Sequence, residues 1–545
     1  MTSSIHGIFS QDLSLYLIGK DSTENSVLSH IDYQKKHRLE KSIYVTLDSI
    51  HEILKRKGYF TSIVEQVTKD KHNYTAKFSL GSKTKRILIL FPEEIKNTYK
   101  NYRFTLKDSV FISPSKAEVF INSILNELDE NGMSFNEVFL ANPKQQNGFF
   151  AFDLKITSSR LRVIDKIITK GYEEFPEHYF KNYYKIGKNT VFSKKRLEEI
   201  SNQTKSLFFL DEKKPPEVLF KKDSTILYLF LKKKNISSID GNLSFASKEN
   251  NDGVLINGNL DLKLKNVLNT GEDFELFWNR IKEGNSEFRV GTRVPYLFRL
   301  PISSSLQFNI YRQDSTFLNT KFNIALDYGI TSKSTLFLSY ASEKSDYLLN
   351  QVSNSIDDFS NYFFGVGYSY FLPSKRALFN EKIYFKTNVS LGKRNQDNFN
   401  SRQLKVESNA TFNIYTSKAS YIHINNKIGY LDSNNFLTNE VFRIGGINSI
   451  RGFNEQSIFT NRFSSTNIEY RYLTSFSSYL YTISDFGIFK ESISNSMKNV
   501  FGVGFGYFFT MKNNAINLGY ALGKNSDSTF NFKDSKFIIS WKSFF

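Results

Sequence analysis

Hydrophobic positions follow two different patterns along the chain, and the change falls near Asn235. Before this point, short alternating runs typical of strands are separated by segments whose apolar residues recur every three or four positions, which is typical of amphipathic helices. After it, strand-like alternation continues to the C-terminus without a convincing helix. The pattern therefore predicts an α+β part up to residue 234 and an all-β part over residues 235–545.

The α+β part repeats one order of elements, β-α-α-β-β, three times. The third copy is the clearest, because Ser193 is a good N-cap for a helix that carries Leu197, Ile200 and Leu207 on one face. Its other predicted elements are a strand at 162–171, a helix near 177–184 and strands at 215–220 and 225–233. The pattern predicts three modules, at residues 12–83, 84–160 and 161–234.

The alternation of side chains in the all-β part predicts a membrane barrel. One face of its strands carries Phe, Tyr, Leu or Val, whereas the other carries Gly, Asn, Ser or Lys, which suits lipid outside and a wet lumen inside. The alternation predicts sixteen strands between Ser237 and Phe545. An even number brings both ends of the barrel to the periplasmic side, and closure leaves no unpaired strand edge in lipid. Clear examples of the alternation are residues 254–265, 363–372, 383–392, 501–509 and 516–523.

Composition agrees with this division. Aromatic residues make up 16% of the chain, which favours strands. No run of 18 apolar residues exists, so no transmembrane helix is predicted. Cysteine is absent, which fits an oxidising compartment. Residues 1–11 are too short for a complete signal peptide and are interpreted as the remnant of one, cleaved near Gln11.

The net charge of +18 would ordinarily suggest an anionic partner. The lysines are spread along the N-terminal half and over alternate strand positions rather than gathered in one patch, and no nucleic-acid motif is present. The sequence therefore predicts no nucleic-acid partner.

Candidate catalytic chemistry is sparse. The seven histidines lack the spacing of metal ligands, and no Gly-x-Ser-x-Gly or phosphate-binding loop occurs. Gly502, Gly504 and Gly506 follow the strand period, so we expect a small-residue stripe facing the lumen rather than a nucleotide cradle. The sequence predicts no enzyme, no catalytic residue, no cofactor and no metal.

Three segments carry a resemblance to a known family. The third module (VIDKIITKGYEEF and FSKKRLEEISNQTKSLFF) resembles a polypeptide-transport-associated (POTRA) domain. The segment FRIGGINSIRGF (442–453) resembles the signature of the sixth extracellular loop in the BamA/TamA superfamily of outer-membrane insertases and translocators, which includes the bacterial surface antigen family. YTISDFGIF (481–489) resembles the next barrel signature of that superfamily. The resemblance covers almost the whole chain and implies periplasmic POTRA repeats followed by a 16-stranded transmembrane β-barrel in the outer membrane.

The resemblance also implies a role for the glycine-rich loop. The loop folds back into the lumen, and Arg451 pairs with acids on the inner wall, which by motif position are Asp485 and Glu469. Gly452 allows a tight turn, and Phe453 anchors the tip. Strand alternation agrees, because lipid-facing Ile468, Tyr470 and Tyr472 turn Glu469 and Arg471 inward. The alternative is that Arg451 is a solvated loop residue.

The last predicted strand, KFIISWKSFF (536–545), ends on an aromatic residue. It resembles the C-terminal signal by which barrels are recognised for insertion, although an ordinary final strand needs the same alternation. The residues on its predicted outer face are Phe537, Ile539, Trp541 and Phe545.

The resemblance implies an outer-membrane assembly or translocation factor. Its periplasmic modules receive unfolded outer-membrane or secreted polypeptides and pass them to a barrel that opens laterally, with periplasmic or lipoprotein accessory subunits as further partners. The seam lies between the first strand (239–247, with Gly241 and Asn242) and the last strand (with Ser540). The alternatives are a two-partner-type polypeptide secretion pore and a passive outer-membrane channel. Three modules argue against both, and a folded-in loop would block a passive channel.

Overall fold

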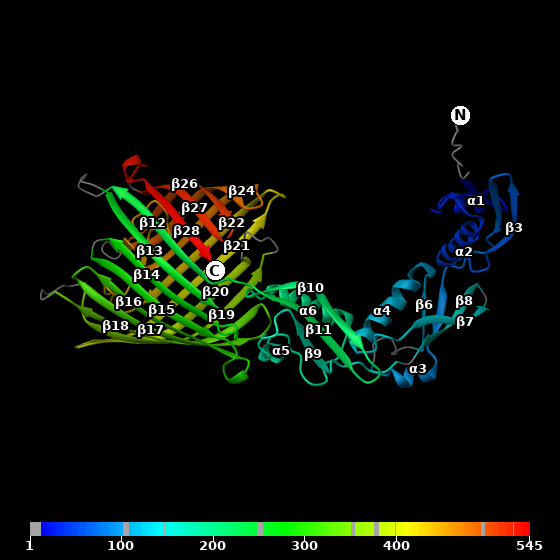
Figure 1. The fold of residues 1–545 in the computed structure, drawn as a ribbon, viewed down its shortest axis with the longest axis horizontal. Coiled ribbons are helices and arrows are strands. Elements are labelled where there is room, and N and C mark those ends of the chain that lie inside the picture. The colour runs from blue at the N-terminus through cyan, green and yellow to red at the C-terminus, as the bar shows by residue number, and fades with distance from the viewer. Residues whose placement is uncertain are drawn as a thin grey trace, which may run out of the picture. The chain divides into compact units, whose positions relative to one another are not determined.

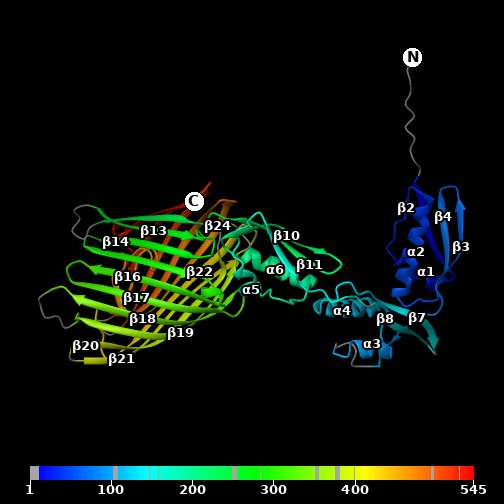
Figure 2. The ribbon, with the colours of Figure 1, turned by 60° about the horizontal axis from the view of Figure 1, so that its bottom comes forward.

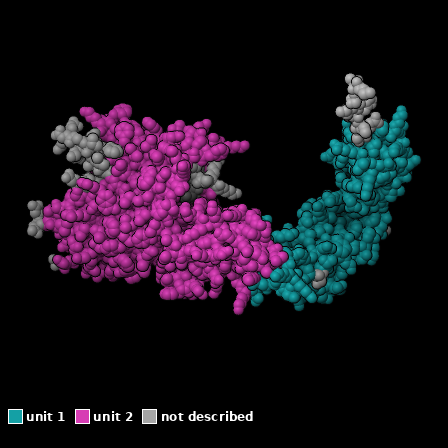
Figure 3. All heavy atoms as spheres, in the orientation of Figure 1, with its two compact units in different colours: residues 1–165, 189–198, 220–225 teal, residues 166–188, 199–219, 226–545 magenta. Residues whose placement is uncertain are grey.

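The computed structural model describes residues 12–101, 108–146, 148–157, 159–247, 254–282, 284–349, 355–374, 381–397, 399–491, 496–526 and 528–545. The predicted signal remnant, residues 1–11, lies outside the described residues. The chain forms two compact units (Figure 3). The first comprises residues 1–165, 189–198 and 220–225, and the second comprises residues 166–188, 199–219 and 226–545.

The first unit contains two four-stranded sheets, in the orders β2-β1-β4-β3 and β6-β5-β8-β7. In each, the first long strand pairs in parallel with the last one, β1 with β4 and β5 with β8. The strands are β1 (Leu13–Gly19), β2 (Lys36–His37), β3 (Ile63–Asp70), β4 (Asn73–Ser79), β5 (Ile87–Leu90), β6 (Ser109–Ile112), β7 (Val138–Gln146) and β8 (Phe149–Ile156).

Amphipathic helices complete both cores of this unit. In α2, Ile43, Leu47, Ile50 and Leu54 recur at helical spacing and are buried with Leu15 and Phe78 of the first sheet. In α4, Ile124 and Leu128 pack in the same way on the second sheet. The helices are α1 (Ser22–Ser29), α2 (Glu40–Arg56), α3 (Glu93–Thr98) and α4 (Ala117–Glu130).

A third sheet, in the order β10-β11-β9, belongs mainly to the second unit. The hydroxyl of Ser193 accepts the backbone N–H of Arg196 at 3.1 Å, as an N-cap does at the start of a helix. Pro215 and Pro216 lie in β10, at the edge of the sheet, where proline is tolerated better than in a central strand. The elements are β9 (Lys166–Lys170), α5 (His178–Asn182), α6 (Lys194–Ser206), β10 (Leu210–Phe220) and β11 (Thr225–Lys233).

The remainder of the second unit is a closed antiparallel barrel (Figures 1 and 2). Within the described residues its wall has sixteen long strands, which confirms the predicted architecture; the short β23 pairs with β24 beyond the end of β22. The wall strands are β12 (Ser238–Ser247), β13 (Val254–Lys265), β14 (Asp273–Lys282), β15 (Asn285–Val294), β16 (Ile302–Gln313), β17 (Phe317–Gly329), β18 (Ser334–Tyr347), β19 (Phe359–Pro373), β20 (Glu381–Gln396), β21 (Phe399–Tyr415), β22 (Ser420–Asp432), β24 (Ile458–Ser475), β25 (Ser478–Glu491), β26 (Met497–Met511), β27 (Asn514–Asn525) and β28 (Lys536–Phe544).

The outer face of this wall is apolar. Large hydrophobic side chains are exposed at alternate strand positions, and the residues between them point inward. A closed barrel with this outer face satisfies every strand edge internally, as lipid requires. No helix in the described ranges is long and apolar enough to cross a membrane. The exposed residues include Leu243, Leu260, Trp278, Phe308, Leu338, Phe364, Val366, Leu391, Ile414, Ile468, Tyr470, Phe505 and Ile539.

The third module packs on two turns of the barrel within the second unit. Tyr172 accepts a hydrogen bond from Asn266 at 3.0 Å and donates one to Asn269 at 2.9 Å, both in the turn between β13 and β14. Tyr179 stacks edge-on against Tyr296, in the connection between β15 and β16, with ring centroids 4.9 Å apart. The module is therefore fixed to this end of the barrel.

Candidate functional site

The glycine-rich loop between β22 and β24, residues 433–457, is closed by its own backbone. Gly446 donates to the carbonyl of Ile450 at 3.1 Å, and Gln456 donates to the carbonyl of Gly445 at 3.2 Å. The φ angles of Gly445, Gly446 and Gly452 are 105°, 93° and 92°, a region that side chains with a Cβ rarely adopt. The glycines therefore permit the turn that brings Arg451 to the inner wall.

Arg451 is 9% exposed and makes a bidentate ion pair with Asp485 on β25. Its Nε and Nη2 donate to the two carboxylate oxygens at 2.9 and 2.7 Å, and its backbone N–H donates to the same carboxylate at 2.8 Å. Its Nη1 also pairs with Glu469 on β24. The structure brings together the three charged residues that the sequence singled out, and Arg451 is not a solvated loop residue.

A second arginine completes this network. Arg471 on β24 donates from Nε to the other oxygen of Glu469 at 2.6 Å and from Nη1 to the hydroxyl of Tyr421 at 3.3 Å. Its guanidinium also lies 5.2 Å from the ring centroid of Tyr479. The sequence predicted that Arg471 points inward but not that it shares Glu469. The cluster is neutral overall, because two carboxylates alternate with two guanidinium groups in the order Asp485, Arg451, Glu469 and Arg471. Buried charges need such pairing.

Glycines on the barrel wall leave space for the loop residues Ile450, Arg451 and Gly452. A Cβ on Gly502 of β26 would lie 2.3 Å from the carbonyl oxygen of Arg451, and one on Gly487 would lie 2.1 Å from the side chain of Ile450. A Cβ on Gly523 would meet the carbonyl oxygen of Gly452 at 2.7 Å. Part of the predicted small-residue stripe therefore makes room for the backbone of the loop. Gly506 serves the wall itself, because a Cβ there would collide with Tyr481.

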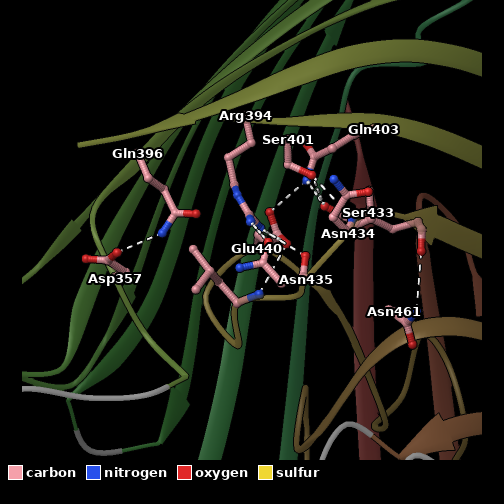
Figure 4. Close-up of polar contacts among 12 residues, drawn as sticks. Asp357, Arg394, Gln396, Ser401, Gln403, Ser433, Asn434, Asn435, Glu440 and Asn461 are labelled. Carbon is pink, nitrogen blue, oxygen red and sulfur yellow. Dashed lines mark hydrogen bonds and ion pairs between the residues drawn. The ribbon is translucent and has the colours of Figure 1, made fainter. Parts of the chain in front are cut away.

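The first part of the loop, which contains Asn435 and Glu440, is held by another ion pair that the sequence did not predict (Figure 4). Arg394 on β20 is fully buried and pairs through Nη1 with Glu440 of the loop. Gln403 on β21 donates to the other oxygen of Glu440 at 3.0 Å, and Arg394 also contacts the side chain of Asn435. The loop is therefore fixed to the wall at two places, at Glu440 and at Arg451.

The first and last strands of the barrel meet directly and form the seam. Eight residue pairs connect β12 and β28, from Ser238 opposite Phe544 to Phe245 opposite Phe537, and Asn242 lies opposite Ser540. Lys542 pairs with Asp240 across the seam at 2.9 Å. Gly241 lies opposite Trp541, which is exposed, so the missing side chain of this glycine is on the lipid face.

The tip of the loop lies behind this seam. A void of about 10 Å³ is lined by Ser244 of β12, by Lys536 and Ile538 of β28, and by loop residues that include Ile447 and Phe453. A void of this size holds about one water molecule. Phe453, the predicted anchor, also packs on the buried cluster of Ile444, Ile450, Phe489 and Val500.

The aromatic face of the last strand has the predicted orientation. Phe537, Ile539, Trp541 and Phe545 are all exposed, whereas Ile538 points inward and is buried. The backbone N–H of Phe545 donates to the carbonyl of Ser237 at 3.0 Å, which extends the pairing at the seam to the terminal residue.

The lumen also contains an open cavity of about 760 Å³, lined mainly by β15 to β22. Lys321, Lys386, Lys405 and Glu407 are among the polar residues around it. Across the described ranges no group of three His, Cys, Asp or Glu side chains is placed to hold a metal ion.

Comparison with known proteins establishes the fold. No family model matches the sequence, and no curated protein is similar to it. CdiB from Acinetobacter baumannii aligns with a TM-score of 0.56 and 14% identity over 84% of this chain and 89% of that one. CdiB from Escherichia coli aligns with a TM-score of 0.52 and 11% identity over 92% and 96%. At these identities the shared property is the fold, small α/β modules followed by a sixteen-stranded barrel.

Proposed function

We propose that this outer-membrane barrel, which shares its fold with the CdiB structures, is a protein assembly or translocation factor. Its periplasmic modules receive unfolded polypeptides and pass them to the seam between β12 and β28. The barrel holds the seam closed at rest and opens it to a client strand. Periplasmic or lipoprotein accessory subunits are further partners in this proposal.

The observation that carries the proposal is the position of the loop tip behind the seam. Ile447 and Phe453 line the same void as Ser244 of β12 and as Lys536 and Ile538 of β28, and Ile447 packs on the cluster that contains Ile538, so the loop tip lies beside the closure. The tip is itself held by the Arg451 network. Movement of the tip would therefore change the packing behind the seam.

The composition of the seam supports opening at this place. The inward side chains of β12 include Asn242 and Ser244, which are small, and Gly241 adds no packing on the lipid face. Backbone hydrogen bonds are the main link between the strands, and a client strand can replace them one for one.

Edge strands in the modules support the first step. β3, β7 and β10 each lie at the edge of a sheet with one neighbour, so each presents unpaired backbone groups. An unfolded polypeptide can add to such an edge as a further strand, whatever its sequence. A passive solute channel would have no use for these modules.

A second candidate is a secretion pore of the two-partner type, in which the client threads the lumen. The open cavity of about 760 Å³ beside the loop favours this alternative. The two candidates differ in the path of the client, through the wall or along the axis, and this difference can be tested.

The test is a disulfide across the seam. The chain has no cysteine, so Asn242→Cys with Ser540→Cys introduces the only two thiols. These residues are directly opposite, and facing residues of an antiparallel pair are about 4.5 to 5.5 Å apart between Cα atoms, which a disulfide can span. If clients leave through the seam, oxidation abolishes assembly while the barrel stays folded, and a reductant restores it.

The matched control ties β28 to its other neighbour. Asn517 on β27 also lies opposite Ser540, so Asn517→Cys with Ser540→Cys places the same bond away from the seam. We expect this variant to keep its activity when oxidised. Full assembly activity in the tied seam variant would contradict lateral opening, and full secretion of a client in that variant would support the threading pore.

A further inference from the structure

A cationic cleft lies within the first unit, between its two sheets. It has a volume of about 590 Å³, and Arg56, Lys57, Lys83, Lys85 and His30 line it. No Asp or Glu is among its lining residues in the described part of the chain. We propose that this cleft binds an acidic segment of a polypeptide, an inference that rests on the proposed function and specifies part of its substrate.

Two basic runs, distant in sequence, are fixed side by side by the backbone. Arg56 and Lys57 end α2, whereas Lys83 and Lys85 lie in the connection between β4 and β5. The N–H of Thr84 donates to the carbonyl of Gly58 at 2.9 Å. Gly58 has a φ of 99°, and a Cβ there would lie 2.3 Å from the carbonyl oxygen of Thr84, so only glycine allows this approach.

The positive charge of the cleft is mostly uncompensated. Arg56 pairs with Glu118 at 3.1 Å, but both side chains are more than half exposed, so water and a competing carboxylate can replace this pair. Lys83 lies 5.9 Å from the ring centroid of Tyr59, a contact that leaves its charge available. Among the described residues Lys57, Lys83 and Lys85 have no carboxylate within ion-pair distance. The cleft therefore attracts a ligand with several negative charges.

The form of the cleft favours a chain over a compact phosphate. The specific phosphate sites of proteins converge backbone N–H groups or bidentate arginines on one anion, whereas this cleft offers separate lysine ammonium groups, and an arginine already paired with Glu118, around an open space. One edge strand ends beside it, because β6 ends at Ile112, next to the lining residue Ser113. A client paired with this edge would continue toward the lysines.

The test measures binding of a labelled deca-glutamate peptide to the full-length protein in detergent, by fluorescence anisotropy. The cleft variant carries Lys57→Gln, Lys83→Gln and Lys85→Gln. The control variant carries Lys20→Gln, Lys41→Gln and Lys155→Gln, three exposed lysines of the same unit outside the cleft, so both lose the same net charge. Each exposed ion pair changes affinity by only a few-fold, and the cleft variant loses three of them. We therefore expect the cleft variant to bind the peptide about tenfold more weakly, and the control variant to bind it like the wild type.

Three outcomes would overturn the inference. The first is that the wild type does not bind the peptide, and the second is that both variants lose the same affinity. The third is that inorganic phosphate, or vesicles containing phosphatidylglycerol, displaces the labelled peptide at a concentration of negative charge at which unlabelled peptide does not. Binding is also measured in the oxidised Asn242→Cys, Ser540→Cys protein. If lateral opening is wrong and the cleft inference is right, peptide binding persists while the seam test fails, so the two failures are distinguishable.

Discussion

At the scale of single residues, the Arg451 cluster shows why a loop arginine can be fixed inside a barrel. Asp485 and Glu469 are 3% and 7% exposed, so neither carboxylate is solvated, and each needs a cation. Arg451 is the cation that both share, and Arg471 contacts only Glu469 among these two acids. Removal of Arg451 therefore leaves Asp485 without its ion pair.

We expect Arg451→Ala to destabilise the barrel and lower its activity. Breaking a buried ion pair from one side costs about 3–5 kcal/mol, because the remaining charge stays buried. The measurement is heat-modifiability in SDS gels, together with client assembly. Arg402→Ala is the matched control, since Arg402 is an exposed arginine of β21. Wild-type melting and assembly in Arg451→Ala would contradict a locking role.

Sequence alone could predict one of the two ion-paired clusters that hold the loop, the one around Arg451. Arg451, Glu469 and Asp485 lie in segments whose resemblance to a family fixed their roles, and strand alternation independently turned Glu469 inward. Arg394 and Glu440 are 46 positions apart. Nothing in the sequence distinguishes Arg394 from other charged strand residues, or Glu440 from other charged loop residues. Only the path of the loop brings them together, and alternation contains no information about that path.

At the scale of elements, the barrel strands were predictable because lipid on one side and a lumen on the other impose a period of two. The predictions were too short where this contrast fades. β20 runs from Glu381 to Gln396, against the predicted 383–392, and β26 runs from Met497 to Met511, against the predicted 501–509. In the third module, the predicted strand 162–171 is shortened to β9, because Val163 makes only an isolated bridge with Val191.

The wall glycines that leave space for the loop provide an element-scale prediction. Gly502→Ala would place a methyl group 2.3 Å from the carbonyl oxygen of Arg451, and backbone on both sides leaves little room to move. Overpacking of this kind costs about 1–3 kcal/mol. We expect the loop tip to lift from β26, with faster hydrogen exchange at residues 450–453.

The matched control is Gly291→Ala on β15, where the nearest atom to an added Cβ is 3.6 Å away, an ordinary contact. This variant tests the general effect of an alanine on the inner wall. Equal exchange rates in the two variants would show that Gly502 does not seat the loop.

At the scale of the whole molecule, the division into modules and barrel was predictable, because the period of the hydrophobic pattern changes near Asn235. The distribution of charge was not. The lysines read as scattered along the sequence, and this interpretation was wrong for the first unit, where Lys57, Lys83 and Lys85 line one cleft. The parallel pairing of β1 with β4 and the contact of Gly58 with Thr84 bring these segments together, and neither is visible in a linear charge pattern.

The attachment of the third module to the barrel contains a group that should respond to pH. His178 on α5 lies 5.6 Å from Tyr296, measured between ring centroids, and its Nε2 is buried without a hydrogen-bond partner in the described residues. Burial lowers the pKa of His178; the nearby Arg299 lowers it further, and a hydrogen bond to the backbone of Thr270 opposes both effects. The attached module therefore favours the neutral imidazole.

The direction of the pH effect follows from this shift. A histidine whose pKa is lowered by attachment contributes its full stabilisation above its ordinary pKa of about 6.5, and this contribution is lost as the pH falls below that value. We expect hydrogen exchange at residues 172–184 and 266–272, expressed relative to the intrinsic rate of each amide at the same pH, to accelerate between pH 7 and pH 5. Tyr179 and Tyr296, which also face His178, stay neutral throughout this range because burial raises the pKa of each hydroxyl further above its ordinary value. In His178→Phe, which keeps a ring at this position but cannot be protonated, the acceleration should disappear, and an unchanged pH profile in that variant would assign the effect to another group.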